Sequence, residues 1–134
     1  MGTQQLLLIV LGVIIVGIAV VVGINIFGTN AEQANKDAIT QDCLRIAAAG
    51  QGFFRKPTML GGGNNKFTGI TLEDCRMTAD GINVNGTYTV TATSATVLDV
   101  VGVSANDASQ TVTVTVDMEA DTDDERVKVA YAGW

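Results

Sequence analysis

The chain of 134 residues has 14 acidic and 8 basic side chains, a net charge of −6 and no histidine. This acidic balance disfavours nucleic acids and anionic lipid surfaces as partners that bind through bulk charge. Without histidine the commonest general base and metal ligand is missing, and Ser94, Ser104 and Ser109 have no GxSxG context. We therefore expect no catalytic residues and no cofactor.

The N-terminal segment is apolar throughout. Residues 1–31 carry no charge, and residues 6–27 read LLLIVLGVIIVGIAVVVGINIF. At 1.5 Å per residue this run forms a helix of roughly 33 Å, about one hydrocarbon thickness. Such a helix must be covered by lipid or by copies of itself, so residues 1–28 are predicted to be a membrane or filament-core helix. Because residues 1–5 contain no Lys or Arg, we expect that a basic leader has been removed.

Three glycines interrupt this run at Gly12, Gly17 and Gly23. Glycine lowers helix stability by about 1 kcal/mol per site, so these positions are candidates for local melting of the helix. The alternative is the ordinary tolerance of glycine in membrane helices, where small residues let helices approach closely. The sequence leaves both interpretations open.

A second helical pattern covers residues 29–56, the start of a globular head predicted over residues 29–134. Thr29 and Glu32 match a capping box, so the helix either restarts there or continues from the first segment with a bend. Its end is marked by Arg55, Lys56 and the only proline, Pro57. Apolar residues recur near helical spacing on one face: Ile39, Cys43, Ile46, Ala47, Gly50, Phe53 and Phe54.

After a loop at residues 57–65, the remainder up to residue 134 is predicted to form an antiparallel sheet. Period-two alternation indicates strands at 87–93, 111–116 and 126–131. A short strand is also expected at 66–72, and the shorter apolar run at 97–103 is either a continuation or a separate strand. Asp80-Gly81 and Asn85-Gly86 are turn signals. The apolar face of the second helix would cover the dry side of this sheet, which gives an α+β fold.

The two cysteines, Cys43 and Cys75, suggest one disulfide in an oxidising compartment. In the loop-entropy account such a bridge stabilises by about 3–4 kcal/mol. The alternative is two free thiols packed as small apolar side chains.

Three further features are weaker signals. Asn85-Gly86-Thr87 matches a glycosylation sequon. We expect Trp134 to pack against the sheet or a neighbouring head. No metal site is expected, because the acidic segment lacks EF-hand spacing and is better interpreted as a solvated turn, although it could supply calcium ligands from Asp117, Glu119, Asp121, Asp123, Asp124 and Glu125.

This order of parts resembles a mature type IV pilin. Such pilins begin with a stretch like FTLIELLIVI, where residues 5–10 here read QLLLIV. Residues 42–47 (DCLRIA) and 53–57 (FFRKP) also look like the helix end of bacterial pilins. The resemblance covers the first 57 residues by motif and the remainder by architecture.

The resemblance implies a helical homopolymer displayed at the cell surface, anchored in the cytoplasmic membrane before assembly. A prepilin peptidase and a pilus assembly machinery would be its partners. The expected filament core is Gln5, Leu6, Leu7, Leu8, Ile9, Val10, Leu11, Val13, Ile14, Ile15, Val16, Ile18, Val20, Val21, Val22, Ile24, Ile26 and Phe27.

One position departs from the family. The family's glutamate at the fifth mature position neutralises the amino terminus of a neighbouring subunit, whereas Gln5 supplies no charge. Three other interpretations stay open: a pseudopilin of a type II secretion system, an archaeal pilus subunit, and a monomeric binding module anchored by a single membrane span.

Overall fold

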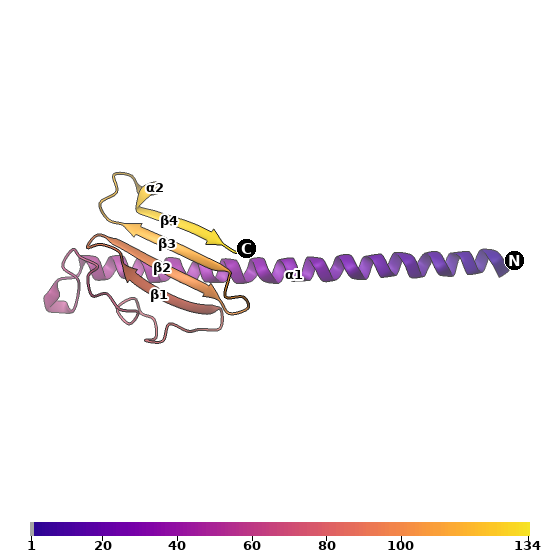
Figure 1. Cartoon of the computed structure of the whole chain (residues 1–134), viewed down its shortest axis with the longest axis horizontal. Helices are drawn as coiled ribbons and strands as arrows, with labels where there is room; N and C mark the ends of the chain where they lie inside the picture. The colour runs from indigo at the N-terminus through magenta and orange to yellow at the C-terminus, as the bar shows by residue number, and fades with distance from the viewer. Residues whose placement is uncertain (1) are drawn as a thin grey trace. The chain divides into compact units, whose positions relative to one another are not determined.

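A computed structural model describes residues 2–134, apart from the side chains of Asp123 and Asp124. The elements follow in the order α1 (Gly2–Arg55), η1 (Thr58–Leu60), β1 (Gly86–Ala92), β2 (Val97–Ser104), β3 (Thr111–Asp117), α2 (Asp123–Arg126) and β4 (Val127–Ala132) (Figure 1). The chain divides into two compact units, an apolar unit that ends at Ala34 and a head unit, Asn35–Trp134. The α+β class predicted from the sequence is confirmed.

The long helix α1 does not restart at Thr29, so the predicted capping box is wrong. Thr29 lies within α1, and its Oγ1 donates to the carbonyl of Asn25 at 3.0 Å. A threonine hydroxyl inside a helix commonly bonds the carbonyl four residues earlier, which leaves no cap. The predicted C-terminal end is confirmed within one residue, since α1 ends at Arg55 and Pro57 follows.

The head unit contains a four-stranded antiparallel meander in the order β1-β2-β3-β4. In register, Val90 pairs with Val100, which pairs with Val114, which in turn pairs with Val129. Alternate residues of β2 and β3 are buried, as period-two strands with one dry face require. These strands match the predicted ones closely in extent.

The core lies between this sheet and the head part of α1. From the helix, Ile39, Cys43, Ile46 and Ala47 are at most 2% exposed. The spacing of three and four residues places them on one face of the helix. The sheet contributes Tyr88, Leu98, Val100, Val112, Val114 and Val116, all fully buried.

Two glycines allow the helix and sheet to approach each other. A Cβ at Gly102 of β2 would lie 2.6 Å from Cγ2 of Ile39 and 2.8 Å from Sγ of Cys43. A Cβ at Gly50 of α1 would lie 2.5 Å from Cδ2 of Leu98. Both gaps are shorter than any real carbon contact, so larger side chains there would force the layers apart.

Residues 66–72, predicted as a strand, form turns instead. Gly69 has φ +80°, a left-handed conformation that interrupts extended backbone. Phe67 is nevertheless fully buried, with its ring centroid 4.9 Å from that of Phe54. Its N–H donates to the carbonyl of Ala95 at 2.7 Å. The segment is therefore held in the head by a buried aromatic side chain in a loop, and not by strand pairing.

The outer face of the sheet is rich in threonine. Thr87, Thr89 and Thr91 of β1 are exposed, and the threonines of β3 alternate with its buried valines. At the C-terminal end, Trp134 is half-buried against the core, and its Nε1 donates to the carbonyl of Thr111 at 2.9 Å. The predicted packing of Trp134 against the sheet is confirmed.

Candidate functional site: an apolar helix surface and an anchored head

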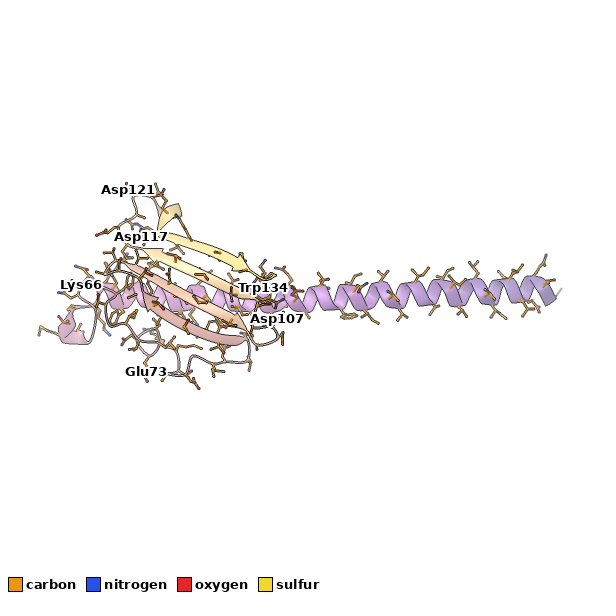
Figure 2. The ribbon with its side chains drawn as sticks, viewed as in Figure 1. Lys66, Glu73, Asp107, Asp117, Asp121 and Trp134 are labelled. Atoms are coloured by element: carbon orange, nitrogen blue, oxygen red, sulfur yellow. The ribbon has the colours of Figure 1, made fainter. Side chains whose placement is uncertain are left out.

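The apolar unit exposes a long run of large apolar side chains. Its seventeen large apolar side chains between Leu6 and Phe27 are each 50–80% exposed. Figure 2 shows side chains projecting on all sides of the N-terminal half of α1. No charged residue interrupts this surface, and Gln5 is also exposed. Every residue predicted for the filament core therefore lies on one continuous, uncovered helix surface.

The three glycines of this segment lie inside the continuous helix. A Cβ added at Gly12, Gly17 or Gly23 would meet nothing within 4 Å. Their lack of a side chain is therefore not required by packing within the chain. By length and composition, α1 is long and apolar enough to cross a membrane, and none of its most apolar window is buried.

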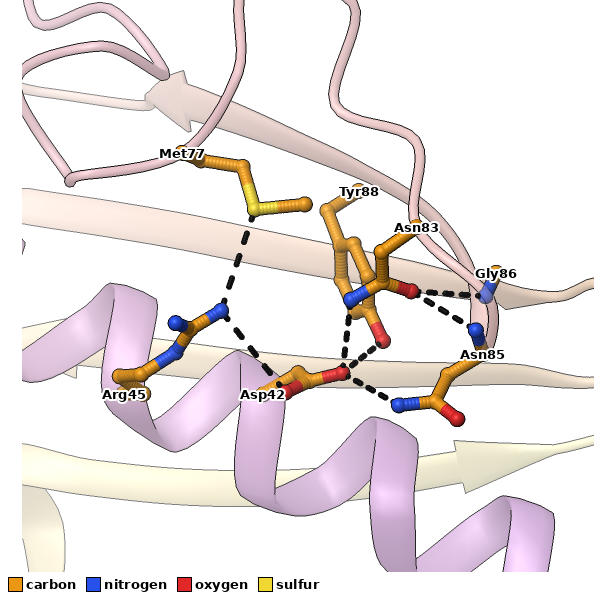
Figure 3. Close-up of polar contacts among 7 residues, drawn as sticks. All are labelled: Asp42, Arg45, Met77, Asn83, Asn85, Gly86 and Tyr88. Carbon is orange, nitrogen blue, oxygen red and sulfur yellow. Dashed lines mark hydrogen bonds and ion pairs between the residues drawn. The ribbon is translucent and has the colours of Figure 1, made fainter.

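The head unit contains a polar cluster centred on Asp42 (Figure 3). The carboxylate Oδ2 accepts hydrogen bonds from Tyr88 Oη at 2.6 Å, Asn85 Nδ2 at 2.9 Å and Asn83 Nδ2 at 3.0 Å. The other oxygen, Oδ1, lies 3.8 Å from a guanidinium nitrogen of Arg45. The cluster ties the turn before β1 and the first strand to α1.

The turn itself is organised by Asn83. Its Oδ1 accepts from the backbone N–H groups of Asn85 at 2.8 Å and of Gly86 at 3.1 Å. Asn residues commonly form such local turns with their own backbone. Gly81, with φ +69°, provides the preceding left-handed residue. The segment that contains the predicted turn signals at residues 80–81 and 85–86 thus places Asn83 and Asn85 within hydrogen-bond distance of Asp42.

The electrostatics of the cluster favour a charged Asp42. Burial raises the pKa of Asp42, but the hydrogen bonds from Tyr88, Asn85 and Asn83, together with the charge of Arg45, outweigh burial and leave the pKa below its usual value. Burial and the neighbouring carboxylate raise the pKa of Tyr88, so its phenol stays a donor. Because Oδ2 accepts three hydrogen bonds that join the turn and β1 to α1, the cluster acts as a structural anchor.

The sequon residue Asn85 belongs to this anchor. Its side-chain nitrogen, the atom that glycosylation would modify, donates to Asp42, and the residue is only half-exposed. Attaching a sugar would remove that bond and require space beside α1. Glycosylation of Asn85 stays a prediction that this geometry disfavours.

The cysteines are free and buried, so the predicted disulfide is not formed. Cys43 donates to the carbonyl of Val112 at 3.9 Å, whereas Cys75 Sγ lies 3.8 Å from the Cβ position of Gly50. Gly50 is seven residues beyond Cys43 in α1, a rise of roughly 10 Å, and a disulfide needs about 2 Å. Burial and neighbouring carboxylates raise the pKa of Cys43 to about 12 and of Cys75 to about 11.

The acidic segment between β3 and β4 does not gather its carboxylates. Among the residues whose side chains the structure describes, no group of three or more His, Cys, Asp or Glu converges on a common point. Asp117 accepts from the backbone of Glu119 at 3.0 Å, and Glu119, Asp121 and Glu125 are exposed. The side chains of Asp123 and Asp124, which belonged to the calcium hypothesis, lie outside the described residues.

Sequence reasoning missed three polar contacts that join α1 to the sheet or to the turn before β1. Ser104 Oγ donates to Asn35 Oδ1 at 2.6 Å, and Asn35 Nδ2 donates to the carbonyl of Asn85 at 3.2 Å. The ammonium of Lys36 lies 4.2 Å from the ring centroid of Tyr131, a cation–π geometry. Each joins residues at least 50 positions apart, so no local pattern marks them.

No protein-family model matches the chain, and neither a curated protein nor a solved structure does. The architecture itself is pilin-like: a long apolar N-terminal helix, with a C-terminal part that packs on a small antiparallel sheet.

Proposed function

We propose that this chain is a structural subunit that polymerises through its N-terminal helix into a type IV pilus-like extracellular filament. The observation that carries the proposal is the exposure of all seventeen large apolar side chains from Leu6 to Phe27 on an uncharged helix. A helix that is apolar on every side is stable only when its whole circumference is covered. Neighbouring copies of the same helix supply that cover in a filament.

The energetics allow the helix to move between two environments. Full burial of one such side chain is favourable by roughly 1.5–3 kcal/mol, so the helix cannot stay in water. Lipid tails and apolar side chains are about equally apolar, so exchanging lipid for neighbouring helices costs little. The proposed cycle therefore starts in the cytoplasmic membrane and ends in a polymer at the cell surface, with a prepilin peptidase and an assembly machinery as partners.

The head unit supports this role by being complete without the apolar segment. Its core residues come from α1 after Ala34, from the sheet and from the segment between them, and the Asp42 cluster holds the turn before β1 to the same helix part. A subunit built in this way can keep a folded head while its first helical segment packs against neighbouring subunits.

Gln5 stands at the position where type IV pilins have a glutamate that neutralises the amino terminus of a neighbouring subunit. Its exposed amide can donate and accept hydrogen bonds but cannot neutralise an ammonium group. We therefore propose that subunits are held by apolar packing, with any buried amino terminus satisfied by carbonyl groups or water.

The test is electron microscopy of filaments sheared from cells that make the full chain, with the subunit identified by mass spectrometry. We expect filaments composed of this chain. The paired variants Ile15→Ala and Ile15→Leu separate polymer from membrane anchor. The alanine variant keeps the helix apolar enough to stay in the membrane but shrinks its packing surface, so we expect it to lower filament yield, whereas the leucine variant keeps the volume and the yield.

A chain that fractionates only with membranes, as single molecules, and gives no filaments at any expression level would overturn the proposal. That result would favour a monomeric module held by one membrane span. A pseudopilin would instead give short assemblies that remain in the cell envelope and are absent from the sheared fraction.

A further inference from the structure

The head unit carries a groove lined by several basic side chains and several small residues. The groove has a volume of about 990 Å³ and runs between the last turns of α1 and the loop at Glu73–Arg76. Its lining includes Ala48, Ala49, Gly52 and Phe53, and a Cβ at Gly52 would meet nothing within 4 Å. A neighbouring chain can therefore approach the backbone of α1 closely at this place. We call this feature the basic groove.

The charges of the basic groove are predominantly positive. Four cations line it, Arg45, Arg55, Lys56 and Arg76, against the two carboxylates Glu73 and Asp74. One of these cations, Arg45, also pairs with Asp42 at 3.8 Å, so the excess of positive charge in the groove comes from Arg55, Lys56 and Arg76. The chain as a whole has a net charge of −6, so this concentration of cations is local and opposite in sign.

The complementary surface is the loop between β3 and β4. Glu119, Asp121 and Glu125 are exposed there, and the half-buried Arg126 donates to the carbonyl of Ala120 in the same loop at 3.3 Å. Figure 2 places Asp117 and Asp121 at the edge of the head opposite to Glu73 of the groove. We call the surface formed by the three exposed carboxylates Glu119, Asp121 and Glu125 the acidic loop.

We propose that the acidic loop of one copy docks into the basic groove of the next copy, and this rests on the proposed polymerisation. Two different, complementary surfaces at opposite edges of one head make a head-to-tail contact, which generates an open helical assembly when its rotation does not close into a ring. Opposite charges also fix the register and disfavour wrong neighbours. The apolar helices would supply the cohesion, and this contact would set the order of the heads around them.

The test uses single charge reversals in the full chain, solubilised in detergent and allowed to assemble as the detergent is removed. Asp121→Lys changes the loop and Lys56→Glu changes the groove. Asp107→Lys and Lys66→Glu are matched controls at exposed positions outside both surfaces. Each reversal should raise the concentration needed for sedimentable filaments by about tenfold, because like charges would then face each other. The controls should leave it unchanged.

Mixing the two reversed chains gives the decisive result. The lysine loop of one chain faces the glutamate of the other groove, and the unchanged acidic loop faces the unchanged groove. We therefore expect an equimolar mixture to recover assembly as an alternating copolymer that contains both chains. Near-ultraviolet circular dichroism should show that each variant keeps a folded head.

The contact is overturned if the reversals assemble like their controls while filaments still form, and the proposed polymerisation then survives. It is overturned equally if the mixture does not recover, because the losses would then be structural. Loss in Lys56→Glu without loss in Asp121→Lys would mean that the groove serves another acidic partner. Wild-type chains that never sediment would overturn the polymer and this contact together.

Discussion

The two parts of α1 differ in how much of the helix circumference is apolar. Between Leu6 and Phe27 the helix is apolar on all sides and every large side chain is at least half exposed. From Ile39 to Phe54 it is apolar on one face only, and the sheet of the head unit covers that face. The width of the apolar face thus indicates what must cover it. A single face needs one sheet, whereas a full circumference needs lipid or several neighbours.

The most direct way to break this comparison is to make the same substitution in both parts. Ile46→Ala should reduce the free energy of unfolding of the head by about 2–5 kcal/mol, because Ile46 is fully buried in the core. Ile18→Ala, at a side chain that is 61% exposed, should change it by less than about 0.5 kcal/mol. Denaturant titration of the detergent-solubilised chain, followed by the fluorescence of Trp134, measures both. Equal losses would contradict the division into two units.

Glycines offer a second matched pair. Gly102→Ala should cost about 2 kcal/mol, since the new Cβ would lie 2.6 Å from Ile39 and 2.8 Å from Cys43 Sγ. Gly17→Ala meets nothing within 4 Å and should leave the stability of the head unchanged. The same titration compares the two variants. A stable Gly102→Ala head would show that the helix and sheet are less closely packed than described.

The pH dependence of unfolding tests how much the Asp42 cluster contributes to the stability of the head unit. Because the folded pKa of Asp42 is lowered, its contribution to stability is present above the unfolded pKa of about 3.9 and is lost as the pH falls through the folded pKa. Asp42→Asn should therefore reduce the free energy of unfolding by about 1–2 kcal/mol at pH 7. The difference from the unchanged chain should shrink below pH 4. Glu119→Gln, at an exposed carboxylate, serves as the control and should show no such convergence.

The smallest expected effect concerns the thiols. Burial and raised pKa values should leave Cys43 and Cys75 unreactive toward an alkylating reagent at pH 8 in the folded chain. Unfolding without any reductant should give two adducts by mass spectrometry. If the unfolded chain accepted adducts only after reduction, Cys43 and Cys75 would be joined by the disulfide that the cysteine count suggested.

The sequence predicted those features that depend on local periodicity. The buried face at Ile39, Cys43, Ile46 and Ala47 follows from helical spacing; β1, β3 and β4 follow from alternation, and β2 follows from a short apolar run. A short strand is predicted at residues 66–72 as well, but no neighbouring strand pairs with them, and pairing is a property of the whole fold. Cysteine spacing likewise gives the loop length but not the point at which the loop residue Cys75 packs against α1, which is near Gly50 and not near Cys43.

The Asp42 cluster could be predicted only in part. Asp42 and Arg45 are three residues apart on one helix, and the asparagines at 83 and 85 sit beside a turn signal, so each half was visible alone. Their meeting spans more than 40 positions and depends on the packing of β1 against α1. The charges of the basic groove are also distributed over two distant segments, which hides their sum in the linear sequence.

The threonine-rich outer face of the sheet has a consequence for how these heads meet water. Hydroxyl groups on short, β-branched stems lose little rotamer freedom and bind water without carrying charge. The hydration of Thr87, Thr89 and Thr91 should thus be insensitive to ionic strength, unlike that of the lysines, arginines and carboxylates elsewhere on the head. Such a surface keeps its hydration at high and at low salt concentration alike.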